Sequence, residues 1–174
     1  MERIVISDTN IFIDLWTMRL LGKFFMLPFE IHTVDMVLAE ITDSNQNEEI
    51  TIAIKNGRLG VEEIQPTELP DVLKLMSGNL TVTDAAVWYT AKKKSALLLS
   101  GDKKLRRLAE SDNVRVAGIL YILDVLIEHG IIAAGYAAEC LELLKGKNKR
   151  LPLAEVDNRL NNWTQLNKHK EEGM

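Results

Sequence analysis

LTVTDAAVWYTAKKKSALLLSGDKKLRRLA, residues 80–109, contains the pattern that decides the fold class. Thr81 to Lys94 has helical periodicity, and Thr81 or Thr83 is a suitable N-cap. SALLLS, residues 95–100, has the composition of a buried strand, and a second helix is predicted from Asp102 to Glu110. A short apolar strand between two helices is typical of an α/β fold with a mostly parallel sheet.

The rest of the chain continues this alternation of short strands and longer helices. The polar stretch 44–58 is predicted to be a loop that leads into a short helix. The sequence therefore predicts a three-layer α/β/α fold around a central, mostly parallel, twisted sheet. Further strands are expected at residues 3–7, 31–34, 59–64 and 114–117, and further helices at 9–23, from 35 onward, at 66–76 and at 119–129.

The C-terminal part differs in composition from the rest. KGKNKR, residues 145–150, is a basic segment that interrupts the helical pattern. After it, Val156, Leu160 and Trp163 form one apolar stripe of a helix, and the end of the chain, 167–174, is expected to be frayed. We therefore expect one domain over residues 1–145 and a helical extension over residues 146–174.

Composition and charge exclude several classes of protein. A single cysteine, Cys140, excludes an internal disulfide framework and a Cys-based zinc site, and it fits a reducing cytoplasm. The first residues do not resemble a secretory leader, and the apolar stretch 118–138 is interrupted by charges, so no membrane span is expected. The net charge of −4 means that nucleic-acid binding would depend on local basic patches.

Four acidic residues are predicted to meet at one edge of the sheet. Asp8 and Asp102 follow strands, Asp84 lies in the first turn of a helix, and Glu40 lies on the helix after the second strand. Ligands of parallel sheets bind at the carboxyl ends of the strands. Each acid alone is also explained as a helix cap or a surface charge.

Taken together, these four acids favour a metal site. Carboxylates at one edge repel one another unless a cation lies between them. Hard oxygen ligands without cysteine or histidine select Mg²⁺ or Mn²⁺. The chemistry typical of such a site is phosphodiester hydrolysis.

Four segments resemble the PIN-domain nucleases over roughly residues 3–125. The resemblance implies that Asp8, Glu40, Asp84 and Asp102 are metal-binding and catalytic, with Asn10 and Ser100 as supporting residues. PIN domains are generally Mg²⁺- or Mn²⁺-dependent ribonucleases, and some are toxins of toxin–antitoxin pairs. The resemblance thus implies an endoribonuclease with RNA as substrate, and an antitoxin protein as partner if the chain is such a toxin. The segments are ISDTNIFIDL (6–15), VLAEI (37–41), the stretch 80–109 and VRVAG (114–118).

Two alternatives follow from departures from these patterns. Many PIN domains carry a further acid or asparagine shortly after the last aspartate, whereas this chain has Lys103, Lys104 and Leu105. A PIN-like domain that binds nucleic acid or protein without cleavage is therefore the alternative function. A phosphatase of the haloacid dehalogenase type also has an acid directly after its first strand. It needs a second aspartate two residues later as general acid, however, and this chain has Asn10 there.

Several other residues have both a functional and a structural interpretation. Asp14 is expected to be structural, near the site, and Trp88 to lie in the core. The apolar helices between residues 119 and 144 would allow a homodimer interface. Basic residues beside Asp102 are candidates for nucleic-acid binding, although they equally suit a soluble surface; they are Lys103, Lys104, Arg106 and Arg107.

Overall fold

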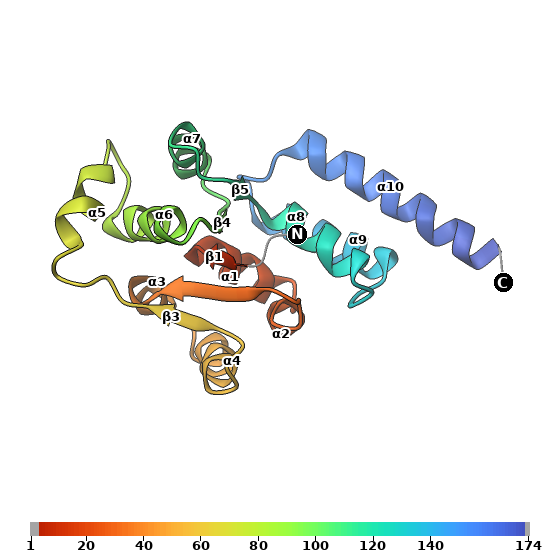
Figure 1. Ribbon diagram of the computed structural model, residues 1–174. Coiled ribbons are helices and arrows are strands. Elements are labelled where there is room, and N and C mark those ends of the chain that lie inside the picture. The colour runs from red at the N-terminus through yellow and green to blue at the C-terminus, as the bar shows by residue number, and fades with distance from the viewer. Residues whose placement is uncertain (1–3, 173–174) are drawn as a thin grey trace.

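A parallel sheet with strand order β3-β2-β1-β4-β5 forms the centre of the molecule (Figure 1). The computed structural model describes the backbone of residues 4–172 and the side chains of residues 4–165. Every pair of neighbouring strands is parallel, so the predicted sheet type is confirmed. The strands are β1 (Ile4–Ser7), β2 (Glu30–Val34), β3 (Gly60–Glu62), β4 (Leu97–Leu99) and β5 (Val116–Ala117).

Helices cover the sheet in two layers. In one layer α6 packs on β1, β2 and β4 and contacts α5 and α7. In the other, α1 contacts α8 and α9, while α2 contacts α4 and α8. The helices are α1 (Thr9–Thr17), α2 (Leu21–Phe24), α3 (Asp35–Glu40), α4 (Ser44–Lys55), α5 (Leu69–Leu75), α6 (Val82–Lys94), α7 (Lys103–Ser111), α8 (Ile119–Glu128), α9 (Ala134–Lys147) and α10 (Leu153–Glu172).

The order of the strands explains this layering and positions the site. From β1 the chain moves outward to β2 and β3, and then returns across the sheet to β4 and β5. Right-handed crossovers therefore put the α1 and α6 connections on opposite faces of the sheet. The reversal occurs between β1 and β4, where a crevice opens at the carboxyl ends of the strands. The predicted three-layer α/β/α fold is confirmed.

The helix predicted over residues 9–23 is divided in the structure. Helix α1 ends at Thr17, Arg19 has a left-handed φ of 58°, and α2 begins at Leu21. The break lets the consecutive residues Leu20 and Leu21 both become buried, which one straight amphipathic helix with a solvent-exposed face does not favour. The single-helix prediction was therefore wrong at this point.

The stretch 44–58 is more helical than predicted. Helix α4 occupies most of it, because the Asp43 carboxylate caps the helix by accepting the backbone N–H of Gln46 at 2.9 Å. Ile50 and Ala53 anchor the helix in the core. Asp43 is the start signal that the prediction of a loop overlooked.

The C-terminal helix packs on the body of the molecule. Helix α10 contacts α9, and its predicted stripe is buried: Val156 is 0%, Leu160 9% and Trp163 5% exposed. The expected boundary between residues 145 and 146 lies within α9, and the division into a domain and an extension stays a prediction. The end of the chain was expected to be frayed over 167–174, but the backbone of residues 167–172 continues α10, and residues 173–174 lie outside the described part. No helix within residues 4–172 has the length and apolar character needed to cross a bilayer.

Candidate active site

Asp8 occupies the centre of the site, at the carboxyl end of β1. Asp8 is buried, with only 2% of its surface exposed to solvent. The carboxylate accepts the backbone N–H of Thr9 at 2.7 Å and caps α1. The backbone N–H of Asp8 donates to the carbonyl oxygen of Leu99 at 2.9 Å, so the strand pairing continues one residue past β1. This pairing fixes the acid at the point where the sheet topology reverses.

Ser100 connects Asp8 with Asp102. Ser7 pairs with Leu99 in the sheet, so the residues that follow them, Asp8 and Ser100, are neighbours. The fully buried Ser100 hydroxyl donates to Asp8 Oδ2 at 2.9 Å and accepts the backbone N–H of Asp102 at 3.1 Å. One hydroxyl therefore joins the two acids that follow the central strands.

Asp102 and Asp84 both cap helices. Asp102 Oδ1 accepts the backbone N–H groups of Lys104 and Leu105 at 2.9 and 2.8 Å at the start of α7. Asp84 forms a capping box with Thr81 at the start of α6: Thr81 N–H donates to Asp84 Oδ2 at 2.8 Å, and Asp84 N–H donates to Thr81 Oγ1 at 3.1 Å. Asp84 and Asp102 therefore both have the structural role of helix capping that the sequence suggested, and they have it at the same edge of the sheet as Asp8.

The electrostatic environment of Asp8 favours a positive ligand. Burial, as the largest cause, raises the pKa of Asp8 to about 6, and the charge of Asp84 adds to the rise. Hydrogen bonds from Ser100, Thr9 and Asn10 act in the opposite direction. No lysine or arginine within residues 4–165 forms an ion pair with Asp8. A cation bound here would replace the missing positive partner.

Glu40 and Asn10 extend the hydrogen-bond network around Asp8. Glu40, the last residue of α3, accepts the Thr9 hydroxyl at 2.5 Å through Oε2. The Asn10 amide donates to Asp8 Oδ2 at 3.4 Å. Glu40 thus reaches the site through Thr9, whereas Asn10 contacts Asp8 directly.

The donor atoms fit Mg²⁺ or Mn²⁺ in kind, but the acids do not form a closed cluster. Within the described side chains, no group of three or more His, Cys, Asp or Glu residues lies close enough to hold a metal ion. Asp84 and Asp102 instead hydrogen-bond to helix N-termini. The site therefore consists of a buried carboxylate with two oxygen-donor acids engaged as caps nearby, all with the hard-ligand chemistry of these ions.

Comparison with known proteins assigns the chain to a family. A family model described as the PIN domain matches residues 4–165. The chain belongs to the PIN-domain family. No curated protein matches it by sequence.

Several solved structures match this PIN domain at low sequence identity. A protein of Pyrobaculum aerophilum is 13% identical with a TM-score of 0.51, and the match covers 72% of this chain and 90% of that one. A PilT N-terminus domain protein of Sulfolobus solfataricus is 16% identical with a TM-score of 0.44, covering 72% and 95%. The Rickettsia felis VapBC2, bound to a DNA fragment from its promoter, is 20% identical with a TM-score of 0.41, covering 66% and 98%.

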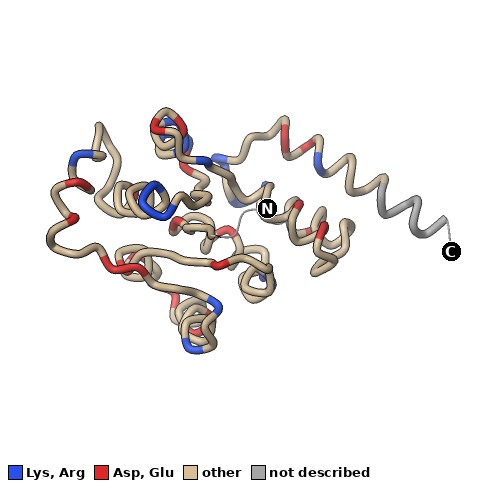
Figure 2. Tube along the Cα trace, in the orientation of Figure 1, with Lys and Arg blue, Asp and Glu red and all other residues tan. Residues whose placement is uncertain are grey.

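A pocket of about 460 Å³ opens beside the acids of the PIN domain. Gly101, between Ser100 and Asp102, forms part of its wall. Its other walls come from Asp14, α7, β5, the N-terminus of α8 and the start of α10. The linker between α9 and α10, residues 148–152, also lines it, except for Lys149. We call it the basic pocket because Lys103, Arg106 and Arg107 line it, together with Arg150 and Arg159. Figure 2 shows basic residues gathered between α7 and the start of α10.

Lys104 lies apart from the three other basic residues of α7. Its Nζ donates to the backbone carbonyl oxygen of Ser77 at 2.9 Å, and it is not part of the wall of the basic pocket. The four basic residues grouped by sequence are therefore divided by the structure into three that line the pocket and one that does not.

The linker contributes two residues that the sequence analysis missed. Asn148 donates its amide to both carboxylate oxygens of Asp14 at 3.0 Å. Arg150 Nη2 donates to Asn10 Oδ1 at 3.2 Å, and thus reaches a residue that contacts Asp8. Burial raises the pKa of Asp14 to about 6, against the effects of Asn148 and Arg150. Two features of the sequence could have indicated these contacts. Asp14 is an acid within an apolar helix and needs a hydrogen-bond donor when it is buried, and the basic run 145–150 could supply one.

Proposed function

We propose that this PIN domain is a divalent-metal-dependent endoribonuclease that hydrolyses RNA phosphodiester bonds in the cytoplasm. The observation that carries the proposal is the buried network of Asp8, Ser100 and Asp102 at the carboxyl ends of the two central strands. A carboxylate buried without a cationic partner costs free energy, so a fold that retains one at a ligand crevice favours a role in binding a cation.

In this proposal each residue has a separate task. Asp8, Asp84 and Asp102 hold Mg²⁺ or Mn²⁺, and Glu40 assists directly or through water. A bound ion of this kind supplies a hydroxide nucleophile and neutralises charge on the phosphate. Ser100 orients the Asp8 carboxylate by its hydrogen bond, and Asn10 orients ligands or water beside the same oxygen.

Cleavage of single-stranded RNA in the presence of Mn²⁺ tests the proposal. We expect Asp8→Asn and Asp102→Asn to lower the cleavage rate by about a hundredfold or more, because each removes a charged ligand. Asp112→Asn is the matched control, since Asp112 follows the other end of α7 and pairs with Lys92. Asp112→Asn should retain the wild-type rate, and EDTA should abolish cleavage. Full cleavage by folded Asp8→Asn would overturn the assignment.

A non-catalytic PIN-like domain that binds nucleic acid is the second candidate function. It is favoured by the capping bonds that occupy oxygens of Asp84 and Asp102. It is also favoured by the lack of the further acid or asparagine that many PIN domains carry shortly after the last aspartate. Calorimetric titration with Mn²⁺ distinguishes the two functions. For a nuclease we expect heat of Mn²⁺ binding in the wild type and none in Asp8→Asn. For a non-catalytic binding domain we expect no heat of Mn²⁺ binding in either protein, although the domain still binds RNA.

The role of toxin with an antitoxin partner stays a prediction from the family resemblance. A toxin of this kind would arrest growth when it is expressed alone, and a neighbouring gene product would relieve the arrest by binding. Expression of the wild type and of Asp8→Asn in the same host is the test. Equal growth of both strains would count against the role.

A further inference from the structure

We propose that the basic pocket binds one phosphate group of the nucleic-acid strand beside the acidic site. The proposal deepens the ribonuclease function and rests on it for the identity of the strand. The acids account for the bond that is cleaved, whereas the basic pocket would hold a neighbouring part of the same strand. Charge, shape and position of the pocket each support this inference.

The wall of the basic pocket carries positive charge that is not neutralised by neighbouring acids. Lys103, Arg106 and Arg107 have neither an ion pair nor a side-chain hydrogen bond within the described part of the chain. By contrast, Arg159 on the same wall pairs with Asp124 at 2.9 Å. Glu110 and Glu155 are acidic wall residues, and Asp14 is hydrogen-bonded to Asn148. Unpaired cations around a concave wall, in a chain of net charge −4, favour an anionic ligand.

Arg106 lies next to the N-terminus of α8. A Cβ atom on Gly118 would lie 2.7 Å from Arg106 Nη1, so the absence of a side chain lets the guanidinium lie against the backbone there. Gly118 is also the N-cap of α8, and no side chain caps this helix. The positive end of a helix and a guanidinium group are therefore adjacent on one wall. Both are established partners of phosphate oxygens.

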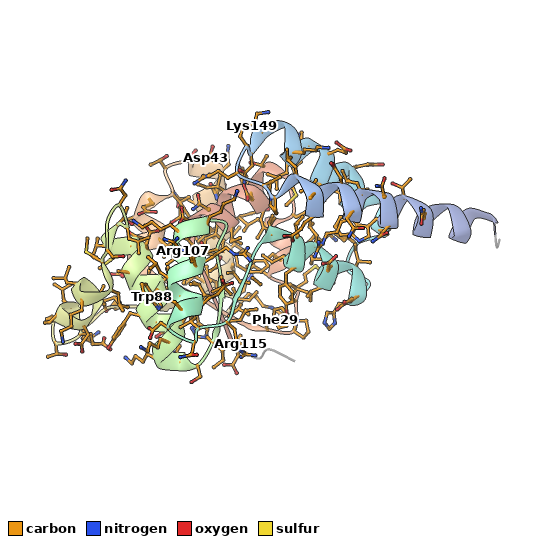
Figure 3. The ribbon with its side chains drawn as sticks, turned by 90° about the horizontal axis from the view of Figure 1, so that it is seen from above. Phe29, Asp43, Trp88, Arg107, Arg115 and Lys149 are labelled. Carbon is orange, nitrogen blue, oxygen red and sulfur yellow. The ribbon has the colours of Figure 1, made fainter. Side chains whose placement is uncertain are left out.

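The basic pocket is connected to the acidic site on two sides. Gly101 lies in the pocket wall and separates Ser100 from Asp102 by one residue. Arg150 also lines the pocket, and it donates to Asn10, whose amide contacts Asp8. Figure 3 shows Arg107 on α7 and Lys149 in the linker that leads to α10, the two segments that enclose the pocket. A volume of about 460 Å³ is within the range of pockets that hold small ligands, and is therefore compatible with a nucleotide.

Binding of a fluorescent single-stranded RNA in EDTA, measured by anisotropy over a range of salt concentrations, tests the proposal without cleavage. We expect Arg106→Gln and Arg107→Gln to weaken binding several-fold each, and the double variant about tenfold or more. For one lost phosphate contact, the slope of log affinity against log salt should fall by about 0.7. Lys104→Gln removes the same charge from the same helix outside the pocket, and should stay within about twofold of wild type.

Each outcome decides for or against the pocket. Absence of RNA binding by the wild type would overturn the proposal, as would equal losses in Lys104→Gln and Arg107→Gln, which indicate general surface charge. Preference for an acidic peptide over RNA would also overturn it. Arg107 is exposed, so Arg107→Gln remains a test if Arg106→Gln fails to fold. If the wild type never cleaves RNA but Arg107→Gln selectively loses binding, the nuclease function fails and the phosphate pocket stands.

Discussion

At the scale of single residues, Asp8 is a carboxylate that lowers the stability of its own fold. It is buried, it has no cationic partner within the described chain, and a second acid acts on it through its charge. Ser100 and Thr9 compensate part of this cost by hydrogen bonds. Binding sites often contain residues that destabilise the ligand-free protein.

Neutralising Asp8 should stabilise the metal-free protein. Burial raises its pKa from 3.8 to about 6 on folding, so the folded state holds the proton more tightly and stability falls as pH rises through this interval. At pH 7.5 we expect Asp8→Asn to unfold with a free energy about 1–3 kcal/mol higher than wild type. The difference should shrink towards pH 4, as the wild-type carboxyl becomes protonated.

Urea unfolding in EDTA at pH 7.5 and pH 4.5 measures this difference. Asp71→Asn is a suitable control, because Asp71 is exposed on α5 and should change the free energy of unfolding by no more than about 0.5 kcal/mol. A variant at Asp8 that is less stable than wild type at pH 7.5 would show that the hydrogen bonds outweigh the burial cost.

At the scale of elements, the linker between α9 and α10 is attached to α1 by one asparagine. Asn148 donates to both oxygens of the buried Asp14, and its own side-chain oxygen accepts the backbone N–H of Arg150 at 2.9 Å. These contacts keep Arg150 beside Asn10 and the basic pocket. The linker is therefore part of the site, although it is distant from the acids in sequence.

Asn148→Ala should destabilise the protein because it leaves the Asp14 carboxylate buried without this donor. We expect a loss of about 1–3 kcal/mol in the free energy of unfolding at pH 7.5. The pKa of Asp14 is already raised to about 6 by burial, and loss of the donor raises it further, so the loss should be smaller at pH 5. Denaturant unfolding at both pH values checks this result, with the exposed neighbour Lys149→Ala as control. Equal losses at both pH values would contradict the role of the charged carboxylate.

The elements around the acids could be predicted because their signals are local. Asp8 directly follows β1, Asp102 lies three residues after the end of β4, and Asp84 lies three residues after its N-cap. Strand ends and helix starts therefore locate these acids without tertiary information. The contacts from Asn148 to Asp14 and from Arg150 to Asn10 span 134 and 140 residues. No periodicity encodes such contacts. The break after α1 was missed because it depends on the burial of both Leu20 and Leu21.

At the scale of the whole molecule, α10 packs on α9, and its C-terminal end projects beyond the other elements (Figure 1). The buried Trp163 is the largest side chain of the stripe that makes this contact. Tyr136 and Leu143 on α9 are exposed by 43% and 46%, and they are the residues to vary if sedimentation reveals the homodimer that was predicted from sequence. The homodimer stays a prediction.

Trp163→Ala should lower the free energy of unfolding by about 3–5 kcal/mol, the usual cost of removing a buried tryptophan. Asn161→Ala, exposed on the same helix, should change it by no more than about 0.5 kcal/mol. Thermal and urea unfolding should each show one transition for the wild type. A cost below about 1 kcal/mol for Trp163→Ala would favour the division into a domain over residues 1–145 and an extension over residues 146–174 that the sequence predicts.

We propose that Asp8, Asp84 and Asp102 surround one divalent cation. A crystal structure with Mn²⁺, in which the ion is located by its anomalous scattering, tests this arrangement. We expect a peak at the carboxyl ends of β1 and β4, within about 2.0–2.5 Å of oxygens from Asp8 and at least one of the other two acids. Absence of a peak at millimolar Mn²⁺, or a peak only at other acids, would contradict it.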